Sequence, residues 1–251
     1  MKINTTATSQ QNYNVSKESE EYYILRLLGY FFVGCVVFYI VFLAFAYALI
    51  TFIPLETEMK WFSDIDTLDE TLGETPEWII ERYKDLPYTF SLIQESGEKN
   101  AYSTLGWHIY LTQEFLDTVK NYETLDFVVG HEIGHIEHRD FLKNIIPTLP
   151  IHIIFSLWGA QELSSIFTWL IENPFNKQQE INADMFGLDF TYQKNAHIGC
   201  ALDFFKEGNT LKDNILEMFS EHPMTQNRIK KAEAYIQKKW YTQTRCTPIL
   251  N

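Results

Sequence analysis

The chain has 251 residues, of which 46% are hydrophobic and 21% are charged, a composition typical of a folded protein. This length supports one sizeable hydrophobic core with an additional segment, rather than two independent enzymatic domains. The formal net charge of -13 argues against a nucleic-acid partner, because phosphate binding requires clustered Lys and Arg. We interpret the excess of acidic residues as a solvated surface.

The chain begins with a polar segment that is followed by a long apolar one. Residues 1–23 are rich in Asn, Ser, Thr, Gln and Glu, which predicts a disordered tail. Residues 27–53 carry no charge. As a helix they would extend about 40 Å, against a hydrocarbon core of about 30 Å. We therefore predict a transmembrane anchor over residues 24–53, which would contact membrane lipid.

The alternative for this segment is a cleaved signal peptide, since Ala44-Phe45-Ala46 resembles a small-x-small cleavage site. The long acidic tail and the length of the apolar run favour the uncleaved anchor, because the hydrophobic region of a signal peptide spans only roughly 7–15 residues. Lys17 and Arg26 precede the uncharged run 27–53, and only Lys60 closely follows it. The positive-inside tendency thus predicts a single-pass membrane protein whose main domain lies on the non-cytoplasmic, periplasmic side.

The three cysteines do not form a recognisable framework. Cys35 lies in the apolar run, whereas Cys200 and Cys246 are isolated in the sequence. A bridge between Cys200 and Cys246 is possible in an oxidising compartment, but nothing in the sequence requires it.

Residues 54–251 predict a mainly α domain with a small β-sheet, an α+β fold. Strand patterns occur at 86–94 and at 101–112, where Gly106 divides the segment into one or two strands. Helical patterns occupy most of the rest, at 55–85 as a helix or helix pair, from 114 onward, and at 123–138, 177–192, 198–205, 211–219 and 224–240.

A second apolar region covers residues 145–171. Pro147, Pro150 and the pair Gln161-Glu162 divide it into two arms of roughly ten residues, each too short to span a bilayer. We predict a helical hairpin that packs on the domain or dips into the membrane surface. Two additional spans are the less favoured alternative.

The motif that indicates chemistry is His131-Glu132-Ile133-Gly134-His135. On a helix, two residues four apart lie about 40° apart around the axis, so both imidazoles can bind one zinc ion at roughly 2.0–2.1 Å. Glu132 lies about 100° from His131, where it is poorly placed as a ligand and well placed to contact a zinc-bound water. This geometry predicts a catalytic metal site with Glu132 as the general base.

Two further segments supply candidates for the rest of the site. Glu180 and Asp184 are four residues apart on a predicted helix, so one carboxylate can bind the metal while the other orients a ligating imidazole. His222 precedes a helix that contains Arg228, and a donor near the metal could stabilise an oxyanion. His138 is about 10 Å along the helix axis from His131, too far to join the same ion.

These segments resemble a known family. Residues 127–140, 179–187 and 222–229 resemble, in order, three signature segments of the HtpX-like and CAAX-prenyl-protease-like membrane gluzincins. Residues 100–112 are similar to that family's strand before the zinc helix, and the likeness spans residues 56–240. It implies that residues 54–251 form a zincin-type zinc metallopeptidase domain that binds one Zn²⁺ ion.

The resemblance also implies a role for each candidate. The implied zinc ligands are His131, His135 and Glu180, the implied catalytic groups are Glu132 as general base and His222 as electrophile, and the implied supporting groups are Asp184 and Arg228. The sequence departs from the family in having Asp140 where a histidine is common. It also has one clear span instead of several, which fits the smaller single-anchor relatives and argues against a prenylated protein as substrate.

The predicted function is zinc-dependent endoproteolysis of a polypeptide substrate in protein quality control. We expect the substrate to add in extended form to an edge strand that includes Trp107, Ile109 and Leu111. The alternative is a zinc-stabilised membrane chaperone or adaptor without protease activity. Glu132 argues against this alternative, because structural zinc sites are usually closed by Cys and His without an adjacent acid.

Overall fold

The computed structural model describes residues 20–62, 72–94, 97, 99–157, 175–203, 222 and 226–249. It divides into two compact units, residues 1–48 and 49–251. Residues 1–19 of the predicted tail lie outside the described residues. Helix α1 (Glu20–Phe52) begins earlier than the predicted start of the anchor at residue 24.

Most side chains along α1 are exposed, among them Phe31, Phe38 and Ile40. Within the described ranges, this is the one helix long and apolar enough to cross a membrane, judged by length and composition. An apolar helix that leaves its side chains uncovered by protein is typical of a lipid-facing segment and not of a core helix. Helix α1 is therefore a candidate membrane span, and the anchor over residues 24–53 stays a prediction.

The larger unit contains a four-stranded sheet in the order β1-β2-β4-β3. β2 (Thr89–Ile93) is parallel to β4 (His108–Thr112), which pairs antiparallel with β3 (Ala101–Thr104). The short strand β1 (Leu72–Gly73) pairs antiparallel with β2 and lies within the segment predicted to be helical. The predicted break at Gly106 is confirmed, since this glycine has a φ of 85° in the turn between β3 and β4.

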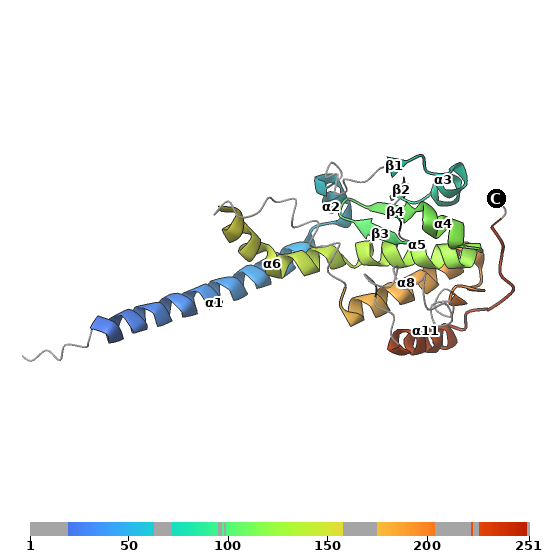
Figure 1. Cartoon of the computed structure of the whole chain (residues 1–251). Helices are drawn as coiled ribbons and strands as arrows, with labels where there is room; N and C mark the ends of the chain where they lie inside the picture. Colours follow the sequence, from blue (N-terminus) through green and yellow to red (C-terminus); the bar gives the residue numbers. More distant parts are fainter. Residues whose placement is uncertain are drawn as a thin grey trace, which may run out of the picture. The chain divides into compact units, whose positions relative to one another are not determined.

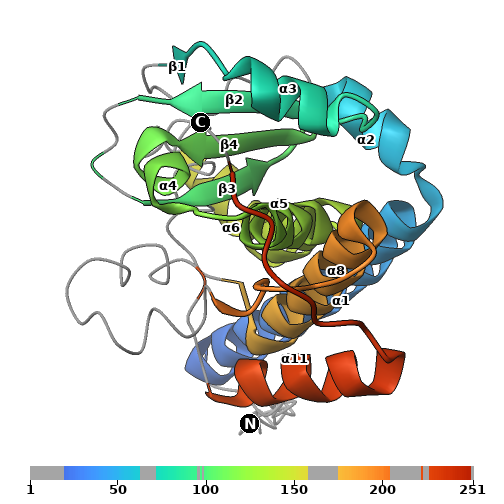
Figure 2. The same cartoon turned by 90° about the vertical axis from the view of Figure 1, so that its right-hand side faces the viewer.

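The position predicted for the substrate strand is wrong. β4 lies between β2 and β3, so Ile109 and Leu111 belong to an interior strand, and Trp107 lies in the turn before it. All three side chains are buried in the core. Alternating apolar residues predicted the strand, but its neighbours depend on pairing between distant segments. The edge that faces helix α5 is β3 (Figure 2).

Seven helices of the larger unit have described bounds: α2 (Leu55–Phe62), α3 (Glu77–Tyr83), α4 (Gln113–Thr118), α5 (Tyr122–Glu137), α6 (Asp140–Leu157), α8 (Lys177–Asn195) and α11 (Gln226–Lys239). Helix α5 lies between the sheet and α8, and α11 packs against α8 (Figure 1 and Figure 2). This arrangement confirms a mainly helical fold with a small sheet.

Helix α6 starts before the predicted apolar hairpin and continues through both of its prolines. The second arm of that hairpin, residues 158–171, lies outside the described residues. The helix predicted at 198–205 begins instead with turns at 199–202, and residues 204–221 are also outside the described part.

Small residues bring α5 and α8 together. Gly130 and Gly134 on α5 meet Ala183 and Gly187 on α8. A Cβ atom at Gly187 would lie 2.7 Å from the carbonyl oxygen of Phe127, and one at Gly134 would lie 3.0 Å from the Cα of Ala183. The two backbones are therefore in direct contact, which leaves no room for larger side chains. Each pair of small residues is four apart, as are His131 and His135 on α5 and Glu180 and Asp184 on α8.

Candidate metal centre

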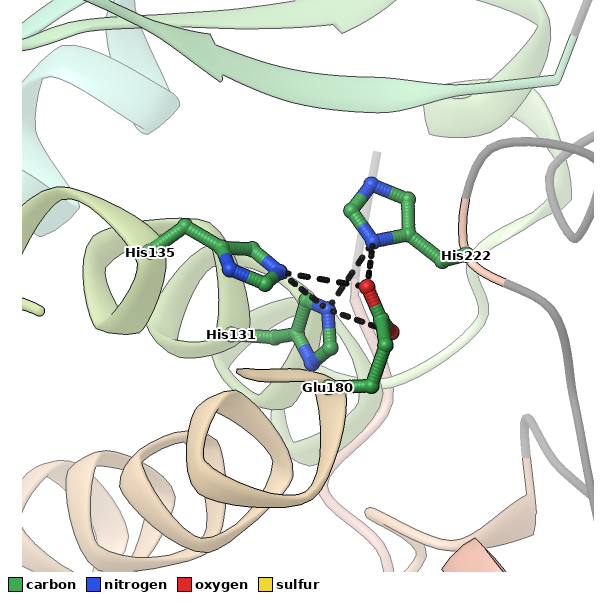
Figure 3. A group of neighbouring side chains, drawn as sticks. All are labelled: His131, His135, Glu180 and His222. Carbon is green, nitrogen blue, oxygen red and sulfur yellow. Dashed lines mark hydrogen bonds and ion pairs between the residues drawn. The ribbon is translucent and has the colours of Figure 1, made fainter. Parts of the chain in front are cut away.

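The three predicted ligands converge between α5 and α8 (Figure 3). The Nε2 atoms of His131 and His135 are 3.1 Å apart, and the Glu180 carboxylate oxygens lie 3.6 Å from His131 Nε2 and 3.5 Å from His135 Nε2. A tetrahedral zinc ion with bonds of about 2.0–2.1 Å has ligand atoms about 3.3 Å from one another. The residues therefore fit a single ion of this size.

His222 lies closer to these ligands than expected for a group that contacts only substrate. Its Nδ1 atom is 3.2 Å from His131 Nε2 and 2.9 Å from Glu180 Oε1, and it belongs to the same group of potential ligand atoms. Its Nε2 atom faces the other way and is 3.6 Å from Glu132 Oε1. From this position the ring can reach the remaining coordination position of an ion or donate to an oxygen atom beside it.

Each candidate ligand histidine of α5 is held by a carboxylate through its second ring nitrogen. His131 Nδ1 is 3.0 Å from Asp184 Oδ1, and His135 Nδ1 is 2.9 Å from Asp140 Oδ2. Such contacts fix the ring orientation and leave both Nε2 atoms available to a metal. The contact of Asp184 fits the predicted supporting role. The role of Asp140 was not predicted, because only the turn after α5 brings its side chain back to His135.

Arg228 holds two acidic residues of α8, Glu180 and Asp184. Its Nε and Nη2 atoms donate to the two oxygens of Asp184 at 2.8 and 2.7 Å, and its Nη1 atom is 2.6 Å from Glu180 Oε2. The same Nη1 atom donates to the backbone carbonyl of His222 at 3.0 Å. Arg228 thus fixes the backbone at His222 and both carboxylates, and this planar two-pronged contact is specific to arginine.

Glu132 lies beside the ligand group and not within it. Its Oε2 atom accepts a hydrogen bond from Ser103 Oγ at 2.9 Å, and its side chain is buried. Ser103 belongs to edge strand β3 and was not predicted, since nothing in the sequence indicates that this strand borders α5. The carboxylate is therefore oriented by the sheet while it faces His222, as a general base for a reaction at the metal would need to be.

Burial and neighbouring carboxylates act oppositely on the two helix histidines. Burial lowers the pKa of His131 below its ordinary value, and the hydrogen bond to Asp184 only partly opposes this. For His135, burial also disfavours the charged form, but Asp140 and Glu180 outweigh it and raise the pKa to about 9. The surrounding carboxylates therefore favour the charged form of His135.

Glu180 and Asp184 have lowered pKa values despite burial. Burial raises the pKa of Glu180, but His222 and His135 outweigh it, so the pKa lies well below the ordinary value. Burial likewise opposes ionisation of Asp184, and the hydrogen bonds from Arg228 lower its pKa. Buried anions require a compensating charge, and a divalent cation bound by imidazoles and a carboxylate supplies one.

The other predicted residues lie elsewhere. Trp107, Ile109 and Leu111 are core residues and not part of the ligand group. His138 caps the C-terminal end of α5 and is likewise absent from that group, as its distance along the helix predicts. An unpredicted neighbour is Phe175, whose ring stacks on His135 with 3.9 Å between centroids.

Comparison with known proteins identifies the family. The model of peptidase family M48 matches residues 80–236. The chain is 22% identical to zebrafish (Danio rerio) mitochondrial metalloendopeptidase OMA1 over 64% of this chain and 38% of that protein. It is 29% identical to the protease HtpX homolog of Methanocaldococcus jannaschii over 43% of this chain and 54% of that protein. The alignments thus span about half the length of these relatives or less. Because the family model covers more than half of the chain, this protein belongs to peptidase family M48, a family of metal-dependent peptidases.

Proposed function

We propose that this protein is a membrane-anchored zinc endopeptidase. The observation that carries the proposal is the convergence of His131, His135 and Glu180 at distances of 3.1 to 3.6 Å, with Glu132 beside them. A purely structural zinc site has no use for a buried carboxylate that is held next to the ligands without joining them. Membership of a peptidase family supports the same function.

Each side chain of the site has its own role in hydrolysis. Bound zinc would supply a Lewis acid and lower the pKa of a water molecule. Glu132 accepts the proton of the attacking water and returns it to the leaving amine, while Ser103 holds the carboxylate in place. His222 donates to the carbonyl oxygen of the scissile bond as negative charge develops there. Asp140 and Asp184 keep the ligating rings in position.

We assign the substrate to strand β3 in place of the strand predicted from sequence. Among the described strands, β3 pairs with β4 alone, and we place an extended peptide along its other edge. β3 also carries Ser103, which contacts the proposed base. A peptide aligned on this edge would therefore run past Glu132.

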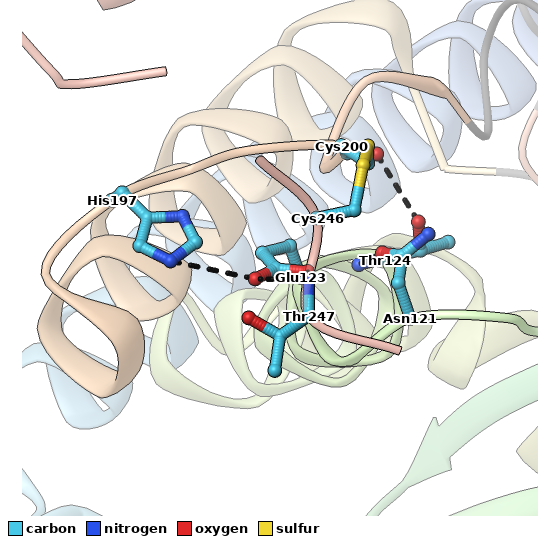
Figure 4. The surroundings of a disulfide bond; sticks show 7 residues. All are labelled: Asn121, Glu123, Thr124, His197, Cys200, Cys246 and Thr247. Atoms are coloured by element: carbon cyan, nitrogen blue, oxygen red, sulfur yellow. Dashed lines mark hydrogen bonds and ion pairs between the residues drawn. A yellow bond between two sulfur atoms is a disulfide. The ribbon is translucent and has the colours of Figure 1, made fainter. Parts of the chain in front are cut away.

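The disulfide between Cys200 and Cys246 supports the predicted non-cytoplasmic location (Figure 4). It joins the turn after α8 to the C-terminal segment, where Glu123 accepts hydrogen bonds from the backbone of Thr247 at 3.1 and 3.0 Å. Disulfides persist mainly in oxidising compartments such as the periplasm. An anchored peptidase there would encounter damaged membrane and envelope proteins, and these are the substrates that we propose.

The test is the variant Glu132→Gln in the full chain, purified in detergent. It should retain zinc but lose turnover of casein or a quenched peptide by at least about 10²-fold, because the proton acceptor is gone. The same change at the exposed Glu233 of α11 should leave the rate unchanged. Equal rates for Glu132→Gln and wild type would refute the assigned base. Full zinc occupancy with no cleavage by the wild type would instead favour the chaperone or adaptor.

A further inference from the structure

Arg139 has an unusual backbone conformation at the end of α5. It follows α5 with a φ of +55°, and its N–H donates to the carbonyl of Ile136 at 2.9 Å. Helices often end with a residue in this left-handed conformation, but the residue is usually glycine or asparagine, since other side chains cost roughly 1–2 kcal/mol. An arginine here indicates that its side chain has a role that offsets this cost.

The guanidinium of Arg139 is bound by two segments near the membrane anchor. It donates to the backbone carbonyls of Ile50, in the last turn of α1, and of Ile53, directly after α1, and its Nε is 3.2 Å from Glu58 Oε2 on α2. The last carbonyls of a helix lack partners within the helix and carry the negative end of its dipole. Arg139 therefore caps α1 from a distant part of the sequence. Only 12% of its side chain and 6% of that of Glu58 are exposed.

The next residue in the chain contacts the metal centre. Asp140 begins α6, and its Oδ2 atom is 2.9 Å from His135 Nδ1. Only His138 and Arg139 lie between α5 and α6, so a shift of the Arg139 backbone moves Asp140 as well. Residues 49–62, which we call the juxtamembrane segment, fall in the same compact unit as the ligands. A continuous set of contacts thus leads from this segment through Arg139 and Asp140 to His135.

We propose that Arg139 is a positioning residue that couples the juxtamembrane segment to the metal centre by fixing Asp140 against His135. The proposal rests on the metal site of the proposed function and extends it. Under this proposal, the end of the membrane anchor helps to hold the zinc ligand His135 in place. Loss of an outer-shell contact of this kind typically reduces metal affinity about 10–100-fold.

The test is the zinc affinity of full-length Arg139→Gly, measured by competition with a chelator. Glycine is better suited than arginine to a φ of +55°. If Arg139 had only a backbone role, Arg139→Gly would therefore have unchanged zinc affinity and equal or greater stability. The proposal predicts an affinity at least 10-fold lower, and a smaller loss for Arg139→Lys, which keeps the charge but not the planar fork. Ala196→Gly is the matched control, because Ala196 has a φ of 60° after α8 and is exposed. Its affinity should equal that of the wild type.

A double-mutant cycle tests whether Arg139 acts through Asp140. In an Asp140→Asn background, Arg139→Gly should lower zinc affinity less than 2-fold, since the contact it supports is already weakened. An equal loss in both backgrounds, or unchanged affinity of Arg139→Gly in the wild-type background, would overturn the proposal. If Arg139→Gly does not fold, Glu58→Ala in the same two backgrounds removes the other end of the contact, and it should lower zinc affinity in the wild-type background only. Failure of the wild type to bind zinc would refute the proposed function itself, so the two failures are distinguishable.

Discussion

Replacing Gly187 by alanine tests how the crossing of α5 and α8 sets the ligand distances. The new Cβ would lie 2.7 Å from the Phe127 carbonyl oxygen and 3.2 Å from the His131 backbone nitrogen. Carbon–oxygen contacts in proteins are about 3.3–3.6 Å, so the helices must separate by at least about 0.6 Å. Neither atom can rotate away, because both belong to the backbone of α5. Glu180 would move away from the histidines together with α8.

The expected effect is larger on metal binding than on folding. Overpacking costs about 1–3 kcal/mol, whereas alanine gains about 1 kcal/mol over glycine within a helix, so the net destabilisation is at most about 2 kcal/mol. The contacts of 3.5 and 3.6 Å between Glu180 and the histidines would lengthen beyond about 4 Å. Sites tolerate misplacement of only about 0.5 Å, so we expect zinc affinity to fall at least about 10-fold.

Chelator competition and urea denaturation of the purified full chain measure these two effects. Gly34→Ala on α1 is the matched control, because a Cβ there meets nothing within 4 Å. It should leave zinc affinity unchanged. Wild-type zinc affinity and stability in Gly187→Ala would show that the close contact of the helices does not position the ligands.

Two further changes probe the stability of the larger unit. Replacing Cys200 and Cys246 by serine should lower the free energy of unfolding in urea by about 4 kcal/mol, because the bond closes a loop with a sequence separation of 46 residues. A loss below 1 kcal/mol would contradict this. Burial raises the pKa of Glu58 to about 7, although Arg139 opposes this shift. Above pH 4.5 the folded chain therefore keeps a proton on this carboxyl that the unfolded chain has released. The free energy of unfolding should therefore fall, relative to that of Glu58→Gln, by up to about 3 kcal/mol between pH 4.5 and pH 8. If the difference in unfolding free energy between wild type and Glu58→Gln does not vary with pH, the raised pKa of Glu58 is refuted.

Sequence reasoning located the ligands because their arrangement is mostly local. The helical repeat places His131 and His135 on one side of α5, and it does the same for Glu180 and Asp184 on α8. The helical repeat does not indicate that α5 and α8 are in contact. The family resemblance implied this contact, because it placed His131, His135 and Glu180 around one ion. The glycines that permit the contact are visible in the sequence, but their partners are not.

Contacts that depend on chain reversals or strand order were missed. Asp140 reaches His135 only because Arg139 adopts a left-handed conformation that directs α6 away from α5. Ser103 reaches Glu132 only because β3 and not β4 forms the edge beside α5. Periodicity specifies which face of a strand is buried, but pairing between distant segments decides which strand is outermost.

The zinc content of purified full-length protein, compared between wild type and Glu180→Ala, tests the central claim most directly. The carboxylate of Glu180 lies between the two helix histidines and Arg228, so its removal leaves the ion without its third protein ligand. We predict one zinc ion per wild-type chain and little or none in the variant, with the fold retained by circular dichroism. Metal-free wild type, or full zinc occupancy in Glu180→Ala, would contradict the account.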